Sequence, residues 1–255
     1  MAEKELKALI FDVDGTIADT ERDGHRVAFN LAFDELGLDW SWSVELYGKL
    51  LSVTGGKERI RYYLECFNQE FKKPDDLDGF IAKLHQLKTQ HYTDLMSKGD
   101  IPLRPGVERL LNEAREQGIR LAIATTTTPK NVEVLLTQLL GAESLTWFDV
   151  IAAGDIVSSK KPASAIYDYA IKELGLDASE CLALEDSHNG ILSSMAADLK
   201  TIVTINEYTK DHDFTGASLV LNHLGEPKEA NTVISGYQCT SNYVDINCCR
   251  EIVNK

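Results

Sequence analysis

The sequence KALIFDVDGT, residues 7–16, predicts a buried strand that ends in a pair of carboxylates. Its first half is apolar, as in the strands of a buried sheet. Asp12 and Asp14 follow directly and project to the same side of an extended chain, because side chains alternate along a strand. Two like charges this close raise each other's pKa, which indicates a bound cation or separate acid and base roles. An aspartate-rich turn can also simply close a strand, so other motifs are needed to choose between the two.

Three further apolar runs, later in the chain, are followed by polar residues: Thr125, Lys161, and the pair Glu185 and Asp186. Pro162 follows Lys161 and is typical of the first position of a helix. In a parallel α/β sheet, ligands bind outside the carboxyl ends of the strands. These side chains, distant in sequence, are therefore predicted to meet in one pocket.

The pattern of apolar residues divides the chain into a core and an insertion. The insertion has helical periodicity, with helices expected from Asp23 onward and at residues 44–51, 58–67 and 77–96. From Pro105 onward, helical and strand patterns alternate as they do in a doubly wound parallel sheet.

The predicted fold class is therefore α/β, with a doubly wound parallel sheet and an inserted α-helical cap. Residues 1–18 and 102–228 are expected to form the catalytic core, and residues 19–101 the cap. The tail, residues 229–255, is polar and lacks the alternating pattern. No role is predicted for it.

The order of the motifs, Asp-x-Asp-Gly-Thr, strand-Thr, Lys-Pro and Glu-Asp, resembles that of haloacid-dehalogenase-superfamily phosphatases. The resemblance extends from about residue 7 to residue 227 and implies a Rossmann-like core. Asp14 resembles the phosphatase and mutase branches, because the dehalogenases lack this second aspartate. The resemblance therefore implies phosphoryl transfer rather than dehalogenation.

Each motif residue suits one role in phosphoryl transfer. Asp12 is predicted to attack phosphorus and form an aspartyl-phosphate, and Asp14 to act as general acid and then as general base. The hydroxyl of Thr125 and the amide of Thr126 would hold phosphate oxygens at a strand-to-helix junction. Lys161 would supply a positive charge to the transferring group.

The carboxylates at the strand ends also suit a metal ion. Mg²⁺ prefers hard oxygen ligands, usually one or two carboxylates together with substrate phosphate. The predicted ligands are Asp12, the backbone carbonyl of Asp14, and Asp186. Glu185 could reach the same ion directly or through water, or could only end its strand.

Substrate choice is expected to depend on the cap. The predicted substrate-binding residues of the cap are His25, Arg26, Gly55, Gly56, Lys57 and Arg59. The glycine pair with its two basic neighbours has the composition of an anion-binding loop, and a second phosphate on the substrate would explain it. An exposed basic turn between two helices is the alternative. Thr20, followed three residues later by Asp23, is typical of a helix cap, so Asp19 and Thr20 are interpreted as structural.

These cap features, together with residues 103–107 and 224–227, are similar to the CbbY-type branch of the superfamily. That resemblance implies hydrolysis of xylulose-1,5-bisphosphate to xylulose 5-phosphate. Ser164, Ala165 and Asp198 depart from the pattern of the branch, beside the motifs rather than in them. A sugar phosphomutase resembling β-phosphoglucomutase shares every core motif and stays the alternative. A non-catalytic sugar-phosphate-binding protein is disfavoured by the intact motifs.

Composition restricts the partners and the compartment. The chain has 255 residues, of which 44% are hydrophobic, and a formal net charge of −14. This charge disfavours nucleic acid and anionic membranes, and no apolar run is long enough to span a bilayer. The expected partner is a small phosphorylated sugar, bound by a monomer. The charged amino terminus predicts no signal peptide and a cytoplasmic location, or the plastid stroma if a transit peptide has been removed.

The five cysteines show neither metal nor redox spacing. Cys66, Cys181, Cys239, Cys248 and Cys249 contain no Cys-x-x-Cys pair. Reduced thiols are therefore predicted, as in proteins of a reducing compartment. No role is assigned to the three cysteines of the tail.

Overall fold

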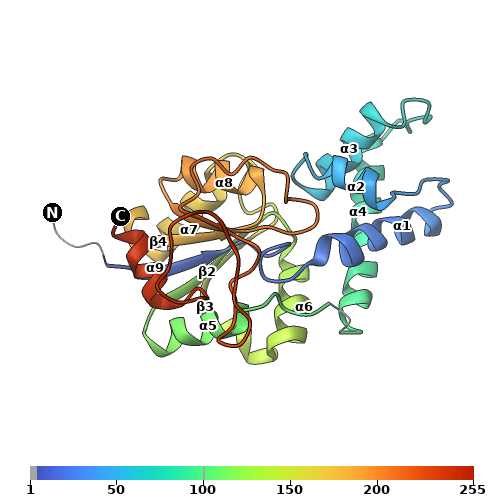
Figure 1. Cartoon of the computed structure of the whole chain (residues 1–255). Helices are drawn as coiled ribbons and strands as arrows, with labels where there is room; N and C mark the ends of the chain where they lie inside the picture. The colour runs from blue at the N-terminus through green and yellow to red at the C-terminus, as the bar shows by residue number, and fades with distance from the viewer. Residues whose placement is uncertain (1–4, 100) are drawn as a thin grey trace.

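The computed structural model describes residues 5–99 and 101–255. It consists of an α/β core and a helical cap that extends from one end of the core, and the carboxyl terminus lies at the opposite end of the core (Figure 1). Within the described residues, seven strands form one sheet in the order β3-β2-β1-β4-β5-β6-β7. The strands are β1 (Ala8–Phe11), β2 (Arg120–Thr125), β3 (Phe148–Ala153), β4 (Cys181–Glu185), β5 (Lys200–Thr204), β6 (Leu219–Leu221) and β7 (Val233–Gly236).

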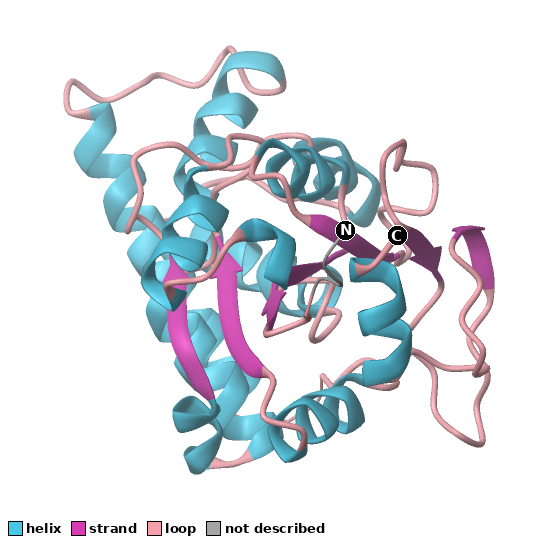
Figure 2. Cartoon of the chain, turned by 90° about the vertical axis from the view of Figure 1, so that its left-hand side faces the viewer, coloured by secondary structure: helices cyan, strands magenta, loops and turns pink. Residues whose placement is uncertain are grey.

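Strands β1 to β6 are parallel, and β7 pairs with β6 in the antiparallel direction. β1 lies between β2 and β4, and every one of its side chains is buried. Parallel strands of this kind require helices on both faces of the sheet, as Figure 2 shows. The predicted doubly wound α/β fold is confirmed.

The alternation of side chains along β1 assigns the covering helices to two layers. Leu9 and Phe11 face the layer of α5 (Val107–Glu116), α6 (Pro129–Leu140) and α9 (Ile246–Val253). Ala8 and Ile10 face α7 (Ala165–Leu174), while α8 (His188–Ala196) covers β5 and β6 on that side. Alanines on this second face bring α7 close to the sheet, and Lys161, which lies just before α7, reaches Asp12 at the end of β1.

The segment between β1 and α5 forms the cap. It comprises a π-helical turn (Glu21–His25), α1 (Arg26–Glu35), α2 (Val44–Leu50), α3 (Gly56–Cys66) and α4 (Leu77–Met96). Aromatic residues fill its own core, where Trp42 contacts both Phe29 and Phe33. The helix expected at 77–96 is present with those bounds, and α2 and α3 differ from the expected bounds by two residues or fewer.

The tail completes the core. β7 extends the sheet at one edge, and α9 buries Ile246, Cys249 and Ile252 against the layer that also contains α5. The prediction of reduced thiols is wrong for two cysteines, because Cys239 and Cys248 form a disulfide with their Cα atoms 5.3 Å apart. The fold brings them together where the chain turns from β7 into α9, and their spacing in the sequence matches no motif.

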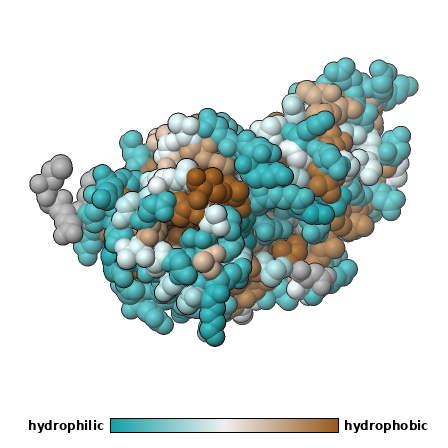
Figure 3. Space-filling view, viewed as in Figure 1, coloured by the Kyte–Doolittle hydropathy of each residue, from teal (hydrophilic) through white to brown (hydrophobic). Residues whose placement is uncertain are grey.

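The surface on the side drawn in Figure 3 is mostly hydrophilic, with apolar residues gathered in small patches. This agrees with the net charge of −14. Among the described helices, none is long and apolar enough to cross a membrane.

Candidate active site

The carboxyl ends of β1, β2 and β4 meet under the cap. Asp12 directly follows β1, Thr125 is the last residue of β2, and Asp186 directly follows β4. All three line one cavity of about 80 Å³, together with Asp14 and Lys161. The predicted convergence of distant motif residues is therefore present in the structure.

Lys161 lies at the centre of the buried charges. Its Nζ donates to Asp12 Oδ1 at 2.7 Å and to Glu185 Oε1 at 2.6 Å. Burial raises the pKa of Asp12 to about 8 even though the Lys161 ammonium acts in the opposite direction. Oδ1 of Asp12 is thus engaged by the lysine, and Oδ2 takes no part in that contact.

The turn that carries Lys161 differs from the prediction. The peptide bond between Lys161 and Pro162 is cis, and α7 begins at Ala165 with Ser164 as its N-cap. The expectation that Pro162 opens the helix is therefore wrong. A turn of the chain before α7, rather than the helix start itself, aims Lys161 at the strand ends.

Glu185 is held by protein groups on both sides. Its Oε1 also accepts a hydrogen bond from the Tyr167 hydroxyl at 2.5 Å, and its side chain is fully buried. Tyr167 lies on the buried face of α7, where its position cannot be distinguished from that of an ordinary core residue in the sequence. The geometry favours Glu185 as the anchor of Lys161.

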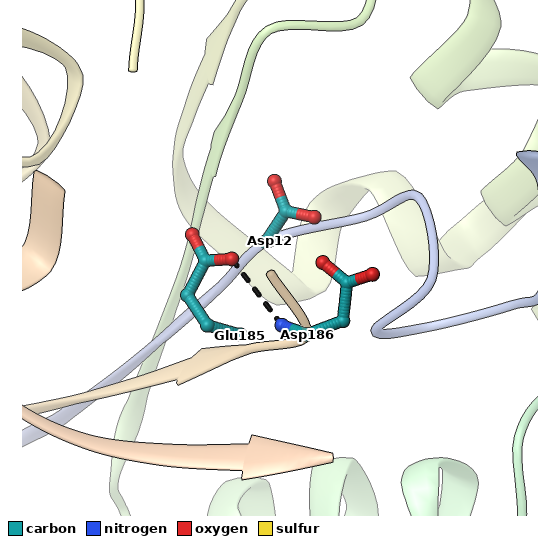
Figure 4. Close-up of side chains that lie close together, drawn as sticks. All are labelled: Asp12, Glu185 and Asp186. Atoms are coloured by element: carbon teal, nitrogen blue, oxygen red, sulfur yellow. Dashed lines mark hydrogen bonds between the residues drawn. The ribbon is translucent and has the colours of Figure 1, made fainter. Parts of the chain in front are cut away.

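Three carboxylates could hold a metal ion. Ligand oxygens of Asp12, Glu185 and Asp186 all lie within 4.8 Å of one another (Figure 4). Burial raises the pKa of Asp186 well above its usual range, and the neighbouring Asp12 charge adds to this. Three buried carboxylates beside one ammonium have excess negative charge, so the donor set fits a divalent cation.

Gly15 allows the loop after β1 to approach this cluster closely. Its φ of +84° is a conformation that glycine adopts without strain, and a Cβ at this position would lie 2.2 Å from Asp186 Oδ2. The glycine of the first motif is therefore needed both for the turn and for the space beside Asp186.

Asp14 is held by two side chains of the segment that follows β1. His25 Nε2 lies 2.8 Å from Asp14 Oδ1, and the Thr20 hydroxyl donates to the same oxygen. Burial opposes the charged form, but His25 and the two hydrogen bonds outweigh burial and lower the pKa of Asp14 to about 2. The interpretation of Thr20 as a helix cap is wrong, since its side chain makes no capping bond. Asp19 accepts from Arg104 at 2.8 Å, which is a structural role.

Lys88, which the sequence did not single out, fixes the state of His25. It lies buried on α4, and its Nζ is 2.6 Å from His25 Nδ1. Burial lowers the pKa of Lys88 to about 8, so most of it is still an ammonium at neutral pH. An ammonium can only donate, so Nδ1 accepts and the ring hydrogen is on Nε2, directed at Asp14.

The basic residues predicted in the cap separate into two groups. Arg59 lines the main cavity, and both Arg59 and His25 line a smaller adjoining one of about 40 Å³. Lys57 instead lies at 2.6 Å from Asp155 of the core and lines a different cleft. Arg26 bonds to backbone carbonyls of the cap and lines none of these cavities.

Gly55 and Gly56 lie beside the smaller cavity rather than the main one, and Thr126 lines both. The remaining residues of the main cavity belong to no sequence motif, because they come from the cap, from the start of α8 and from the loop after β5. They are Glu21, Leu51, Thr54, Ser187, Asn189, Asn206, Tyr208, Thr209 and His212.

The protein without metal is expected to lose stability as the pH rises from about 4 to about 8. In this range the folded state keeps the Asp12 proton, which the unfolded state has lost, because folding raises the pKa of Asp12 from 3.8 to about 8. The free energy of unfolding should fall by at most about 1.4 kcal/mol per pH unit for this group. Thermal unfolding in the presence of EDTA measures the slope.

Asp12→Asn is the control for this experiment, and it should reduce the slope by the contribution of Asp12, because an amide does not titrate. Asp186, whose pKa burial also raises, keeps its own contribution. Excess Mg²⁺ should flatten the slope as well, since the cation replaces the proton. Equal slopes for the wild type and Asp12→Asn would contradict the assigned pKa of Asp12.

A parallel sheet with an aspartate pair and a lysine at its strand ends defines an enzyme of phosphoryl transfer. The chain belongs to the family of haloacid dehalogenase-like hydrolases, whose sequence profile matches residues 6–198. It is 47% identical to Protein CbbY, plasmid, of Cupriavidus necator over 224 residues, which make up 88% of each chain. The CBBY-like protein of Arabidopsis thaliana is 42% identical and matches over 87% of this chain and 70% of that relative.

Two solved structures of CbbY from Rhodobacter sphaeroides are similar to this fold. The complex with phosphate is 45% identical, with a TM-score of 0.80, and the match covers 88% of this chain and 96% of that chain. A mutant in complex with xylulose-(1,5)bisphosphate is 44% identical, with the same TM-score of 0.80 and the same coverage of 88% and 96%. The chain is thus a phosphatase of the CbbY-type branch, as predicted.

Proposed function

We propose that this phosphatase removes the 1-phosphate of xylulose-1,5-bisphosphate and releases xylulose 5-phosphate, with Mg²⁺ as its cofactor. The observation that carries the proposal is one cavity with Asp12 and Lys161 at the sheet and Arg59 at the cap. Positive side chains at both ends suit a substrate with two phosphates. The Rhodobacter relative that was solved with this bisphosphate supports the same choice.

The first step transfers the phosphoryl group to Asp12. Asp12 attacks as a carboxylate, and binding of the cation would displace the proton that its raised pKa otherwise retains. Its Oδ2 then forms a bond to phosphorus while the ester bond to the sugar oxygen breaks. Lys161, fixed at 2.7 Å from Oδ1, offsets negative charge on the transferring group, and Thr125 donates to a phosphate oxygen. The sugar oxygen leaves with a proton from Asp14.

The proton needed in this step comes to Asp14 through His25. With its pKa lowered to about 2, Asp14 is a carboxylate in the free enzyme at neutral pH. His25 Nε2 carries a hydrogen 2.8 Å from Asp14 Oδ1, and Lys88 is hydrogen-bonded behind it. The three side chains can therefore supply one proton when the ester bond breaks.

The second step hydrolyses the aspartyl-phosphate. Water attacks phosphorus, the bond to Asp12 Oδ2 breaks, and the Asp14 carboxylate takes the proton of the water. Asp12, Asp186 and the backbone carbonyl of Asp14 would hold Mg²⁺, with Glu185 outside the ligand set. The cation would reduce the repulsion between a carboxylate and a phosphate dianion.

Arg59 is the proposed contact of the phosphate that is not transferred. Its NH1 donates to the Tyr47 hydroxyl at 2.9 Å, and its bonds to the carbonyls of Leu50 and Val53 are long, at 3.3 and 3.4 Å. Such long bonds are weak, so the guanidinium keeps donors for a phosphate. Thr126 lies across the smaller cavity from the cap and can offer its amide.

Arg59→Ala is expected to lower kcat/KM for xylulose-1,5-bisphosphate by about tenfold or more, the effect of one charged hydrogen bond. Hydrolysis of p-nitrophenyl phosphate, which lacks the second phosphate, should change much less. Steady-state kinetics with both substrates separates binding of the remote phosphate from damage to the catalytic centre.

Lys57→Ala is the matched control, because Lys57 lies in the same turn of the cap but pairs with Asp155 outside the cavity. Its kcat/KM should fall by a similar small factor for both substrates. Equal losses on both substrates in Arg59→Ala would mean that Arg59 supports the cap and does not hold phosphate.

A further inference from the structure

The core loop after β5, residues 206–209, contacts both the presumed metal ligand and the cap. At one end, Asn206 Nδ2 donates to Asp186 Oδ2 at 2.7 Å. Asn206 Oδ1 accepts from the backbone N–H of Tyr208 at 2.9 Å. This second bond fixes the orientation of the amide, so that its NH₂ group must face Asp186.

The other end of the loop reaches the cap through the ring of Tyr208. This ring packs with the aromatic core of the cap, and its centroid is 6.1 Å from that of Tyr47. It also covers Gly48 in the middle of α2, where a Cβ would lie 3.2 Å from a ring carbon. A glycine inside a helix weakens the helix. The contact with Tyr208 explains why a glycine is found at position 48, because a larger residue would crowd the ring.

Two properties of Tyr208 indicate that the ring, and not the hydroxyl, carries this contact. Within the described residues, its buried hydroxyl has no hydrogen-bond partner. The ring is the part that meets Gly48 and Tyr47. The backbone N–H of the same residue holds Asn206, so a shift of the ring would also shift the bond that orients the amide.

We propose that Tyr208 is a positioning residue that couples the packing of the cap to the orientation of Asp186. The ring is seated on α2 and so holds the loop, and Asn206 directs Asp186 toward the metal position. A ring without this seat would leave Asp186 without its fixed orientation. The inference rests on the proposed role of Asp186 as a metal ligand.

Metal affinity tests the coupling without any measurement of turnover. Mn²⁺ has the same preference for oxygen ligands as Mg²⁺, and electron paramagnetic resonance of the free ion gives its dissociation constant. Groups that orient metal ligands typically change affinity by about tenfold or more when removed. Asn206→Ala and Tyr208→Ala should both weaken Mn²⁺ binding by about this factor, although Tyr208 does not touch Asp186.

Three variants exclude a general loss of structure. Tyr208→Phe keeps the ring and should bind Mn²⁺ as the wild type does. Gly48→Ala crowds the ring while improving the helix, so it should weaken Mn²⁺ binding by about threefold or more without a lower unfolding temperature. Tyr62→Ala removes a cap aromatic that packs on Phe67, away from the loop, and should leave Mn²⁺ binding unchanged.

Asp186→Ala separates this inference from the proposed function. If Asp186→Ala weakens Mn²⁺ binding and Tyr208→Ala stays within twofold of the wild type, the coupling is refuted and the metal site stands. If Asp186→Ala leaves Mn²⁺ binding unchanged, the metal role fails and the coupling fails with it. A loss in Tyr208→Phe equal to that in Tyr208→Ala would also refute the role of the ring.

Discussion

Asp12→Asn is expected to lower phosphate release by at least about 10³-fold while the fold stays intact. The amide oxygen can still accept the hydrogen bond that Lys161 makes at 2.7 Å, so the local packing is preserved. An amide cannot form the aspartyl-phosphate, because it lacks the nucleophilic carboxylate oxygen. Phosphate release measured with saturating substrate and Mg²⁺, beside a thermal unfolding curve, tests both parts of the expectation.

Asp34→Asn is the matched control for this substitution, since Asp34 is an exposed aspartate on α1. It should release phosphate at the rate of the wild type. Turnover of Asp12→Asn within tenfold of the wild type would exclude Asp12 as the nucleophile.

Asp14→Asn is expected to lower kcat by about 10²–10⁴-fold with a much smaller change in KM. The amide oxygen can still accept a hydrogen bond from His25 Nε2, which lies 2.8 Å from Asp14 Oδ1 in the wild type. The amide can neither give nor take the proton that the two steps require. Steady-state kinetics on the bisphosphate separates the two parameters. A raised KM with an unchanged kcat would make Asp14 a binding residue and contradict its role as acid and base.

The convergence of the four motifs could be predicted because it follows from local patterns. Asp12, Thr125 and Asp186 stand where an apolar run ends. Lys161 follows such a run in the loop before α7. Parallel strands have their carboxyl ends at the same edge of the sheet. Asp12, Thr125, Lys161 and Asp186 accordingly share one cavity.

Other site residues could not be predicted, because the sequence pattern around them is the same as around residues that have no role in the site. Lys88 and Tyr167 lie on buried faces of helices, where ordinary core residues recur with the same helical spacing. Thr20 matches a helix cap in sequence, yet its hydroxyl bonds to Asp14. Tyr208 lies in a loop, and its contact with Gly48 depends on how the cap and the core pack together.

The roles of the two basic residues in the glycine turn of the cap could not be predicted from the sequence either. Lys57 and Arg59 look equivalent as neighbours of a glycine pair. In a helix, side chains two positions apart point to different sides, so Arg59 faces the cavity while Lys57 reaches Asp155. In the tail, helical spacing is confined to Ile246, Cys249 and Ile252 of the short helix α9. The disulfide and the pairing of β7 with β6 leave no pattern in the sequence.

The most direct test of the proposed reaction is a phosphorus NMR spectrum of the enzyme with Mg²⁺ and xylulose-1,5-bisphosphate, recorded until the signals stop changing. We expect the 1-phosphate signal to disappear, one equivalent of inorganic phosphate to appear, and the 5-phosphate signal to remain as xylulose 5-phosphate. A new sugar-phosphate signal without inorganic phosphate would indicate a mutase, and an unchanged spectrum would indicate a binding protein. Either of these two results would contradict the proposed hydrolysis.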